Sequence, residues 1–265
     1  MVVLVMIDGM RPDALDAVHC RTIEALCAAG ASTMQAQSVM PSVTLPCHMS
    51  IFHSVPPTRH GITTNIMFIP MARPLPGLIE QMRSAGKRAA CIHNWEPLRD
   101  ISRPEQVAYS YYREPPLDQS YDDAVGAEAV RLLREEGASF DFVFLYFGSV
   151  DAAGHASGWM SPEYLNQLQR VDGWLGRVLD VAPPGATIVV QADHGGHDRT
   201  HGTDSPEDMA IPWIAAGPAI RRNYRIAASV SLLDTAPTLA RVLGIAPHAE
   251  WEGRIIEEIF VNDER

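Results

Sequence analysis

The sequence predicts an α/β fold in which a mostly parallel central sheet carries helices on both faces. Short apolar strands alternate with longer helical stretches along the 265 residues, an order typical of parallel sheets. The strand candidates are nearly continuous runs of β-branched and aromatic residues, as expected for strands that are buried on both faces. Glycines stand just past several helix candidates, where helix C-termini favour them.

Five strands are expected from their apolar runs. The first begins directly after Met1 and ends at an Asp-Gly pair, and the third is the most aromatic. In chain order the strands are Val2–Ile7, Ala89–His93, Phe142–Phe147, Thr187–Ala192 and Trp213–Ala215.

Six helices are expected between and beside these strands. Four of them are followed at once by a glycine, namely Gly30, Gly86, Gly137 and Gly244. In chain order the helices are Thr22–Ala29, Leu45–His53, Leu78–Ala85, Tyr121–Glu136, Pro162–Leu179 and Leu232–Leu243.

We expect one domain over residues 1–265, with a small cap or substrate-binding insertion at about residues 66–120. This segment is rich in Pro and Arg, and its aromatic residues are candidates to stack a nucleobase over the site. A surface subdomain that packs its own small core is an equal alternative. The aromatic residues concerned are Phe68, Trp95, Tyr111 and Tyr112.

Charge and composition exclude several classes of partner. The net charge is -11, from 21 basic and 32 acidic residues, and no basic run exists, so a nucleic-acid polymer is not an expected partner. The apolar run Val2–Ile7 is too short to cross a bilayer, and we expect no membrane partner. The four cysteines have no CxxC spacing, and we expect reduced thiols in a cytoplasmic protein.

Polar residues that could take part in catalysis or metal binding follow three of the strands. Asp8 follows Val2–Ile7, Asp151 comes shortly after Phe142–Phe147, and Asp193 with His194 follows Thr187–Ala192. Ligands of open α/β sheets bind outside the carboxyl ends of the strands, so these acids are expected in one site. Taken singly, Asp8 is also compatible with a turn or helix-capping role, and Asp151 with capping the helix that follows it.

The segment from Asp193 to Gly202 is the richest in metal-ligand side chains. It holds three histidines and two aspartates within nine residues, a mixture that suits zinc and comparable transition metals. The alternative is a polar loop whose histidines face water. Asp151 and His155, four residues apart, are able to face one metal from a single helical turn.

Thr44 stands just before a predicted helix, and Pro46 occupies a position that the first helical turn tolerates. Its hydroxyl is therefore a candidate N-cap. A helix N-terminus is also a natural phosphate-binding position, because free N–H groups and the helix dipole point at the anion.

Taken together, these motifs resemble the alkaline phosphatase superfamily, and within it the nucleotide pyrophosphatase/phosphodiesterase branch. The resemblance runs from residue 8 to about residue 254, and its motifs are specific jointly rather than singly. The motifs that carry it, in order, are Asp8-Gly9, Thr44-Leu-Pro-Cys-His48, His60-Gly61-Ile62 with Asn65, Ser149-Val-Asp151 with His155, Asp193-His194-Gly195, His201-Gly202, the segment Asp208 to Pro218, and Asp234 to Gly244.

The resemblance implies an alkaline phosphatase-like core with two divalent metal ions. Asp151, His155 and His201 would hold one ion, and Asp8, Asp193, His194 and the Thr44 hydroxyl the other. Thr44 would be the nucleophile, and Asn65 would bind a non-bridging phosphate oxygen. The last histidine follows Asp193 by only eight residues, whereas the animal enzymes have a long insertion there, so His197 competes with His201 as a ligand.

The expected activity is hydrolysis of phosphodiester or pyrophosphate bonds of nucleotides or small organic phosphates, through a phospho-threonine intermediate. Two divalent ions bring the charge of three carboxylates to +1, and to about zero once Thr44 is ionised, which suits a singly charged diester. Arg11, Arg59 and Arg73 would weaken this preference if they reached the pocket. Zinc is the first choice of metal and manganese the second.

Several alternatives share these residues. A phosphomonoesterase or phosphonate hydrolase of the same superfamily fits the metal set equally well, whereas a phosphosugar mutase normally needs a larger second domain. A catalytically silent metal-binding protein is the alternative from another class. The sequence does not indicate an oligomeric state, and a homodimer is compatible with it.

Overall fold

A central sheet organises the chain in the computed structural model, which describes all residues except 67–70, 72–73, 104, 117–119 and 262–265. In this part of the chain eight strands lie in the order β4-β3-β5-β1-β6-β7-β2-β8. The strands are β1 Val2–Ile7, β2 Ala31–Gln37, β3 Ala89–His93, β4 Tyr109–Tyr112, β5 Phe142–Phe147, β6 Thr187–Gln191, β7 Ala210–Ala216 and β8 Tyr224–Arg225.

The sheet is mostly parallel, as the sequence predicts. Strands β4, β3, β5, β1 and β6 run parallel, and only β7 runs antiparallel to its neighbours β6 and β2. Every residue of β1, β3, β5 and β6 is buried, because both faces of the sheet are covered.

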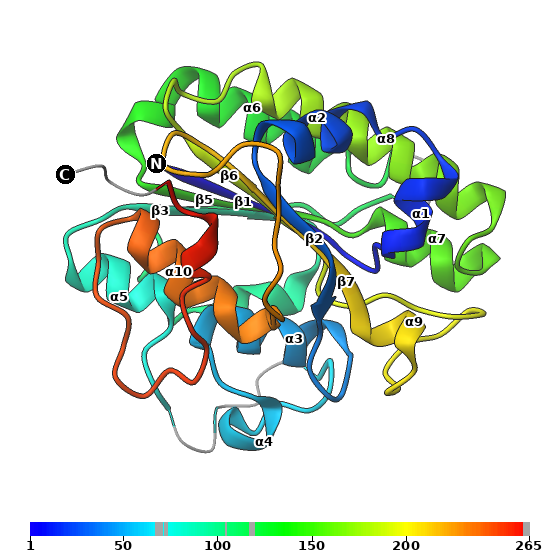
Figure 1. Ribbon diagram of the computed structural model, residues 1–265, viewed down its shortest axis with the longest axis horizontal. Helices are drawn as coiled ribbons and strands as arrows, with labels where there is room; N and C mark the ends of the chain where they lie inside the picture. The colour runs from blue at the N-terminus through cyan, green and yellow to red at the C-terminus, as the bar shows by residue number, and fades with distance from the viewer. Residues whose placement is uncertain (67–70, 72–73, 104, 117–119, 262–265) are drawn as a thin grey trace.

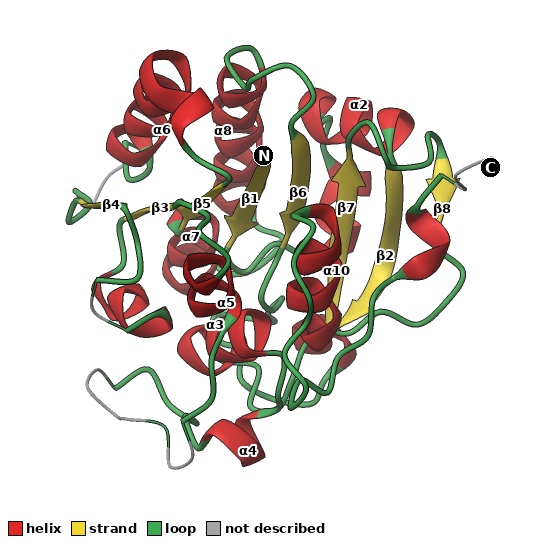
Figure 2. Cartoon of the chain, turned by 90° about the vertical axis from the view of Figure 1, so that its left-hand side faces the viewer, coloured by secondary structure: helices red, strands yellow, loops and turns green. Residues whose placement is uncertain are grey.

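Helices cover both faces of this sheet, with α2, α6 and α8 on one side and α3, α5 and α10 on the other (Figures 1 and 2). No described helix is both long and apolar enough to cross a bilayer. The helices are α1 Pro12–Ala17, α2 Arg21–Ala29, α3 Thr44–His53, α4 Pro57–His60, α5 Leu78–Ser84, α6 Asp123–Glu136, α7 Ser149–Ser157, α8 Pro162–Leu179, α9 Pro206–Met209 and α10 Thr235–Val242, with short 3₁₀ helices at Glu96–Ile101, Gly137–Ser139, Leu232–Asp234 and Glu257–Ile259.

Helix α3 lies at the centre of its layer. All ten of its residues are buried, and Phe52 packs edge-on against Phe142 and Phe144 of β5, with ring centroids 6.4 and 5.0 Å apart. A helix buried on all sides has one fixed position on the sheet. The first residue of this helix, Thr44, is therefore held firmly in space.

The strands that sequence reasoning missed lack a continuous apolar run. Apart from Met34, strand β2 is made of small and polar residues, and only Ala31 and Ala36 are fully buried along it. Strand β7 is longer than the expected Trp213–Ala215 although it contains Pro212, because the pairing of β2 is irregular between Thr33 and Ala36, opposite that proline. Strands β4 and β8 are edge strands of four and two residues.

Residues 66–120 contribute partly to the main fold. Helix α5 packs against α3, and β3 and β4 form one end of the sheet, so only the remaining residues of this segment are available for a cap. Of the aromatic residues considered for base stacking, Phe68 lies outside the described residues, while Tyr112 is 42% exposed at the end of β4. The cap stays a prediction.

A pair of glycine substitutions tests the packing between α2 and the sheet. A Cβ on Gly30, which links α2 to β2, would lie 2.0 Å from the Ala215 carbonyl oxygen, whereas one on Gly173 in α8 would meet nothing within 4 Å. We expect Gly30→Ala to lower the free energy of unfolding by about 1–3 kcal/mol. Gly173→Ala should raise it by about 0.5–1 kcal/mol, as alanine does in a helix interior. Urea denaturation measures both, and equal shifts of the same sign would contradict this packing.

Candidate active site

The site forms where the three central parallel strands end. Strand β1 lies between β5 and β6, with Ile7 level with Phe147 and Met6 level with Gln191. The residues that follow these strand ends therefore meet at one edge of the sheet, as the sequence predicts.

The first cluster joins helix α7 to the loop after β6. Ligand atoms of Asp151, His155 and His201 all lie within 4.8 Å of one another. The Nε2 atom of His155 is 3.5 Å from Asp151 Oδ2, and that of His201 is 3.6 Å from Asp151 Oδ1. Asp151 and His155 stand one helical turn apart on α7, so both side chains face the same side.

Backbone carbonyls orient both histidines of this cluster. His155 Nδ1 donates to the Arg199 carbonyl oxygen at 3.0 Å, and His201 Nδ1 donates to the Ser42 carbonyl oxygen at 2.8 Å. A neutral imidazole that donates from Nδ1 has a free lone pair on Nε2. Each histidine therefore presents the atom that a metal ion would bind.

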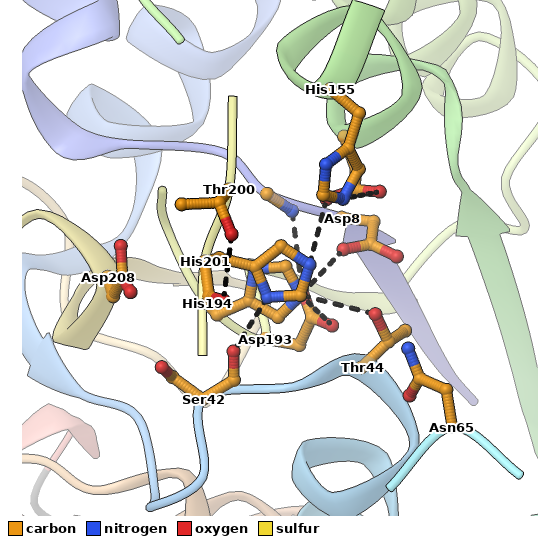
Figure 3. Close-up of polar contacts among 12 residues, drawn as sticks. Asp8, Ser42, Thr44, Asn65, His155, Asp193, His194, Thr200, His201 and Asp208 are labelled. Carbon is orange, nitrogen blue, oxygen red and sulfur yellow. Dashed lines mark hydrogen bonds and ion pairs between the residues drawn. The ribbon is translucent and has the colours of Figure 1, made fainter. Parts of the chain in front are cut away.

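The second cluster surrounds His194 (Figure 3). Its Nε2 atom lies 3.2 Å from Asp8 Oδ1, 3.2 Å from the Thr44 hydroxyl and 3.4 Å from Asp193 Oδ2. The Nδ1 atom donates to the Gly195 carbonyl oxygen at 2.8 Å, so the lone pair again points inward. All four predicted residues of the second metal group thus lie together.

Asp151 lies between the two clusters. Its carboxylate also falls within 4.8 Å of ligand atoms of Asp8 and His194. The rings of His194 and His201 stack with centroids 3.8 Å apart and planes 12° apart, which brings the two groups side by side. The arrangement is one continuous centre rather than two separate sites.

The carboxylates of this centre lack compensating charge. Burial, followed by the charges of Asp193 and Asp151, raises the pKa of Asp8 well above its ordinary value, and burial also raises the pKa of Asp151. Oxygens Asp8 Oδ1, Asp151 Oδ1 and Asp193 Oδ2 have no hydrogen-bond partner among the described residues. Unpaired carboxylate oxygens that face imidazole Nε2 atoms fit divalent cations, so the side chains suit the metal ions that the resemblance implies.

Thr44 and Asn65 adjoin the second cluster. Thr44 is 4% exposed and is the first residue of α3, where the helix dipole favours an anion. The Asn65 side-chain oxygen accepts a hydrogen bond from the Leu45 backbone N–H at 2.9 Å, which places the amide beside Thr44. This contact leaves the Asn65 amide nitrogen as the donor toward a ligand.

His197, the competing ligand, lies outside the centre. Its Nδ1 is 2.7 Å from Oδ1 of Asp208, and its side chain is 31% exposed against 8% for His201. The fully buried Asp208 also accepts hydrogen bonds from the backbone N–H and the hydroxyl of Thr203, both at 2.8 Å. His197 therefore helps to hold the loop, and His201 is the histidine that the structure brings to Asp151.

The structure adds Tyr146 to the site and gives contacts to Gly9 and His48, which the sequence motifs contain without a stated role. The Tyr146 hydroxyl donates to Asp8 Oδ2, and the Gly9 N–H donates to Asp193 Oδ1 at 3.3 Å. His48 is fully buried, and its Nδ1 donates to the Thr44 carbonyl oxygen at 2.8 Å. Tyr146 had a signal in the sequence, because a tyrosine within an apolar strand needs a partner for its hydroxyl.

Known proteins resemble this chain in sequence and in fold. The sequence profile of the family described as type I phosphodiesterase / nucleotide pyrophosphatase matches residues 2–209. A phosphopentomutase of Allorhizobium ampelinum is 30% identical over 179 residues, which cover 66% of this chain and 40% of that protein. The catalytic subunit of mouse GPI ethanolamine phosphate transferase 3 is 24% identical over 192 residues, 69% of this chain and 17% of that protein. The chain thus spans less than half the length of these curated relatives.

Solved structures share the fold. Murine ectonucleotide pyrophosphatase / phosphodiesterase 5 superposes with a TM-score of 0.77 at 17% identity, covering 93% of this chain and 96% of that one. A 2-O GAG sulfatase superposes with a TM-score of 0.80 at 16% identity, covering 97% of this chain and 73% of that one. These likenesses place the chain among alkaline phosphatase-like folds.

In the metal-free protein, the free energy of unfolding should depend on pH through the carboxylates of this centre. Burial and the charge of Asp151 raise the pKa of Asp193 to about 7, against about 3.9 in an unfolded chain. The folded state therefore holds a proton there that the unfolded chain has lost, and this stabilisation disappears as the pH rises from about 4 through about 7. We expect Asp193→Asn, which cannot ionise, to gain stability relative to the wild type over that range.

Urea denaturation of both chelator-treated proteins at a series of pH values checks this. If the difference in free energy of unfolding between Asp193→Asn and the wild type stayed constant with pH, the pKa of Asp193 would not be raised in the folded protein.

Proposed function

The chain belongs to the type I phosphodiesterase / nucleotide pyrophosphatase family, and from that premise we propose that it hydrolyses phosphodiester or pyrophosphate bonds. The substrates we propose are nucleotides or small organic phosphates. The observation that carries the proposal is the position of Thr44. A buried hydroxyl at a helix N-terminus lies 3.2 Å from His194 Nε2, beside three carboxylates that each have one oxygen without a hydrogen-bond partner among the described residues.

We propose two metal groups around this hydroxyl. Asp151, His155 and His201 would hold one divalent ion, and Asp8, Asp193 and His194 with Thr44 the other. When bound, such ions supply the positive charge that lowers the pKa of an alcohol and offsets the charge of phosphoryl oxygens. The mixture of imidazole and carboxylate favours zinc, with manganese second.

Thr44 would act as the nucleophile. Its Oγ1 forms a bond to phosphorus while the bond from phosphorus to the leaving oxygen breaks, and the hydroxyl proton is lost to solvent as the leaving group gains one. Water then cleaves the phospho-threonine and restores the hydroxyl. The N-terminus of α3 and the Asn65 amide would meanwhile donate to a non-bridging phosphate oxygen.

The surrounding charges support a diester over a monoester. Arg11 donates to the Gly196 carbonyl oxygen and pairs with Asp13, and Arg59 pairs with Glu250 and Glu252. Arg73 lies outside the described residues. Within the part that the structure describes, no Lys or Arg forms an ion pair with the aspartates of the centre, and a dianionic monoester would want such a cation.

We propose a small-molecule partner and a cytoplasmic location. The net charge of -11 opposes binding of a nucleic-acid polymer. All four cysteines are free thiols, which supports a reducing compartment.

Steady-state hydrolysis of bis-p-nitrophenyl phosphate and p-nitrophenyl phosphate tests the proposal. Chelator-treated protein reloaded with zinc or manganese should cleave the diester faster. Thr44→Ala should lower kcat by at least about 10³-fold, because the attacking oxygen is gone. Thr44→Ser, which keeps a hydroxyl, serves as the matched control and should retain activity well above that of the alanine variant.

Other outcomes separate the alternatives. Faster cleavage of the monoester would favour a phosphomonoesterase and contradict the charge argument. Equal activity of Thr44→Ala and wild type would exclude the covalent mechanism. Metal binding without turnover of either ester would favour a silent metal-binding protein.

A further inference from the structure

Helix α7 lacks a side-chain cap of its own. The residue before its first turn is Gly148, which offers no oxygen to the free N–H groups of the helix N-terminus. A distant carboxylate takes this role. Asp122, the residue before α6, accepts hydrogen bonds from the Gly148 N–H at 3.1 Å, the Ser149 N–H at 3.3 Å and the Ser149 hydroxyl.

The Asp122 carboxylate is itself fixed in place. It is 1% exposed, and Asn94, just after β3, donates to its Oδ1 from Nδ2 at 2.8 Å. The Ser149 hydroxyl accepts a further hydrogen bond from Gln167 Nε2 of α8 at 2.8 Å. This chain of contacts ties the start of α7 to the end of β3, the start of α6 and the middle of α8.

One face of α7 borders an open cavity. Ala152, Ala153 and Ala156 on this face line a cavity of about 780 Å³, together with residues of α8 such as Asn166 and Arg170. Packing on that face is therefore incomplete. The hydrogen bonds to Asp122 are a directional restraint on where the helix begins.

Helix α7 carries metal-ligand candidates of both clusters. Asp151 and His155 follow Ser149 by two and six residues, and the Asp151 carboxylate lies between the clusters. A helix is rigid over such a distance, so a shift or tilt of its first turn moves both ligand atoms. Small displacements matter, because groups that orient metal ligands typically affect affinity by about 10–100-fold.

We propose that Asp122 is a positioning residue for the metal centre, which it serves by fixing the N-terminus of α7 and with it Asp151 and His155. This inference rests on the proposed function. It goes beyond it by assigning a task to a buried carboxylate that touches neither a ligand atom of the centre nor, in the proposed mechanism, the substrate.

A second buried aspartate provides a matched control. Asp172 of α8 is 6% exposed and caps α2 in the same way, accepting hydrogen bonds from the Thr22 and Ile23 N–H groups at 3.0 and 2.9 Å. Helix α2 carries none of the site residues. If Asp122 only stabilised the fold, replacing either aspartate should therefore have the same effect on stability and on zinc affinity.

The experiment compares zinc affinity in Asp122→Asn, Asp172→Asn and the wild type, by competition with a chromophoric chelator near pH 7.5. Urea denaturation of the metal-free proteins runs beside it. We expect similar losses of stability in the two variants. Only Asp122→Asn should weaken zinc binding, by about 10–100-fold, with Asp172→Asn within about twofold of the wild type.

Ser149→Ala gives a milder test if Asp122→Asn does not fold. It removes one donor to Asp122 and should weaken zinc binding severalfold. Zinc affinity unchanged in Asp122→Asn, or weakened equally in Asp172→Asn, would overturn the positioning role while the proposed function stands. A wild type that binds no zinc or manganese would overturn both.

Discussion

The burial of three neighbouring aspartates is the constraint on which the active site depends. Asp8, Asp151 and Asp193 reach one edge of the sheet from strands that are neighbours in space and far apart in the chain. Each has an oxygen without a hydrogen-bond partner in the described part of the structure, and burial raises the pKa of each. Divalent cations bound among these carboxylates would relieve this cost, and they would supply the positive charge that phosphoryl transfer requires.

The three histidines around these aspartates are oriented in the same way. His155, His194 and His201 each donate from Nδ1 to a backbone carbonyl, so each presents Nε2 inward. The carbonyls belong to loops that follow β2 and β6, and these loops are themselves anchored by buried contacts such as that of Asp208 with Thr203. The fold therefore fixes the orientation of the imidazoles before any ligand arrives, which is the preorganisation that such catalysis requires.

How much the sequence predicts depends on the physical signal that each element carries. Strands buried on both faces are continuous apolar runs, and Val2–Ile7, Ala89–His93 and Phe142–Phe147 end where the sequence predicts. Strand β2 has no such run, since Met34 is its one large apolar residue and β7 and β8 supply its backbone partners. The role of Asp122 was not predictable. Its partners Asn94 and Ser149 lie 28 and 27 residues away, and such contacts leave no recognisable motif in the sequence.

Anomalous diffraction from crystals of the zinc-loaded protein tests whether the three aspartates hold two metal ions. We expect two zinc peaks per chain roughly 3.5–4 Å apart, one bound by Asp151, His155 and His201 and the other by Asp8, Asp193 and His194 beside Thr44. A single peak, or zinc held by His197 and Asp208 with the three aspartates unliganded, would contradict it.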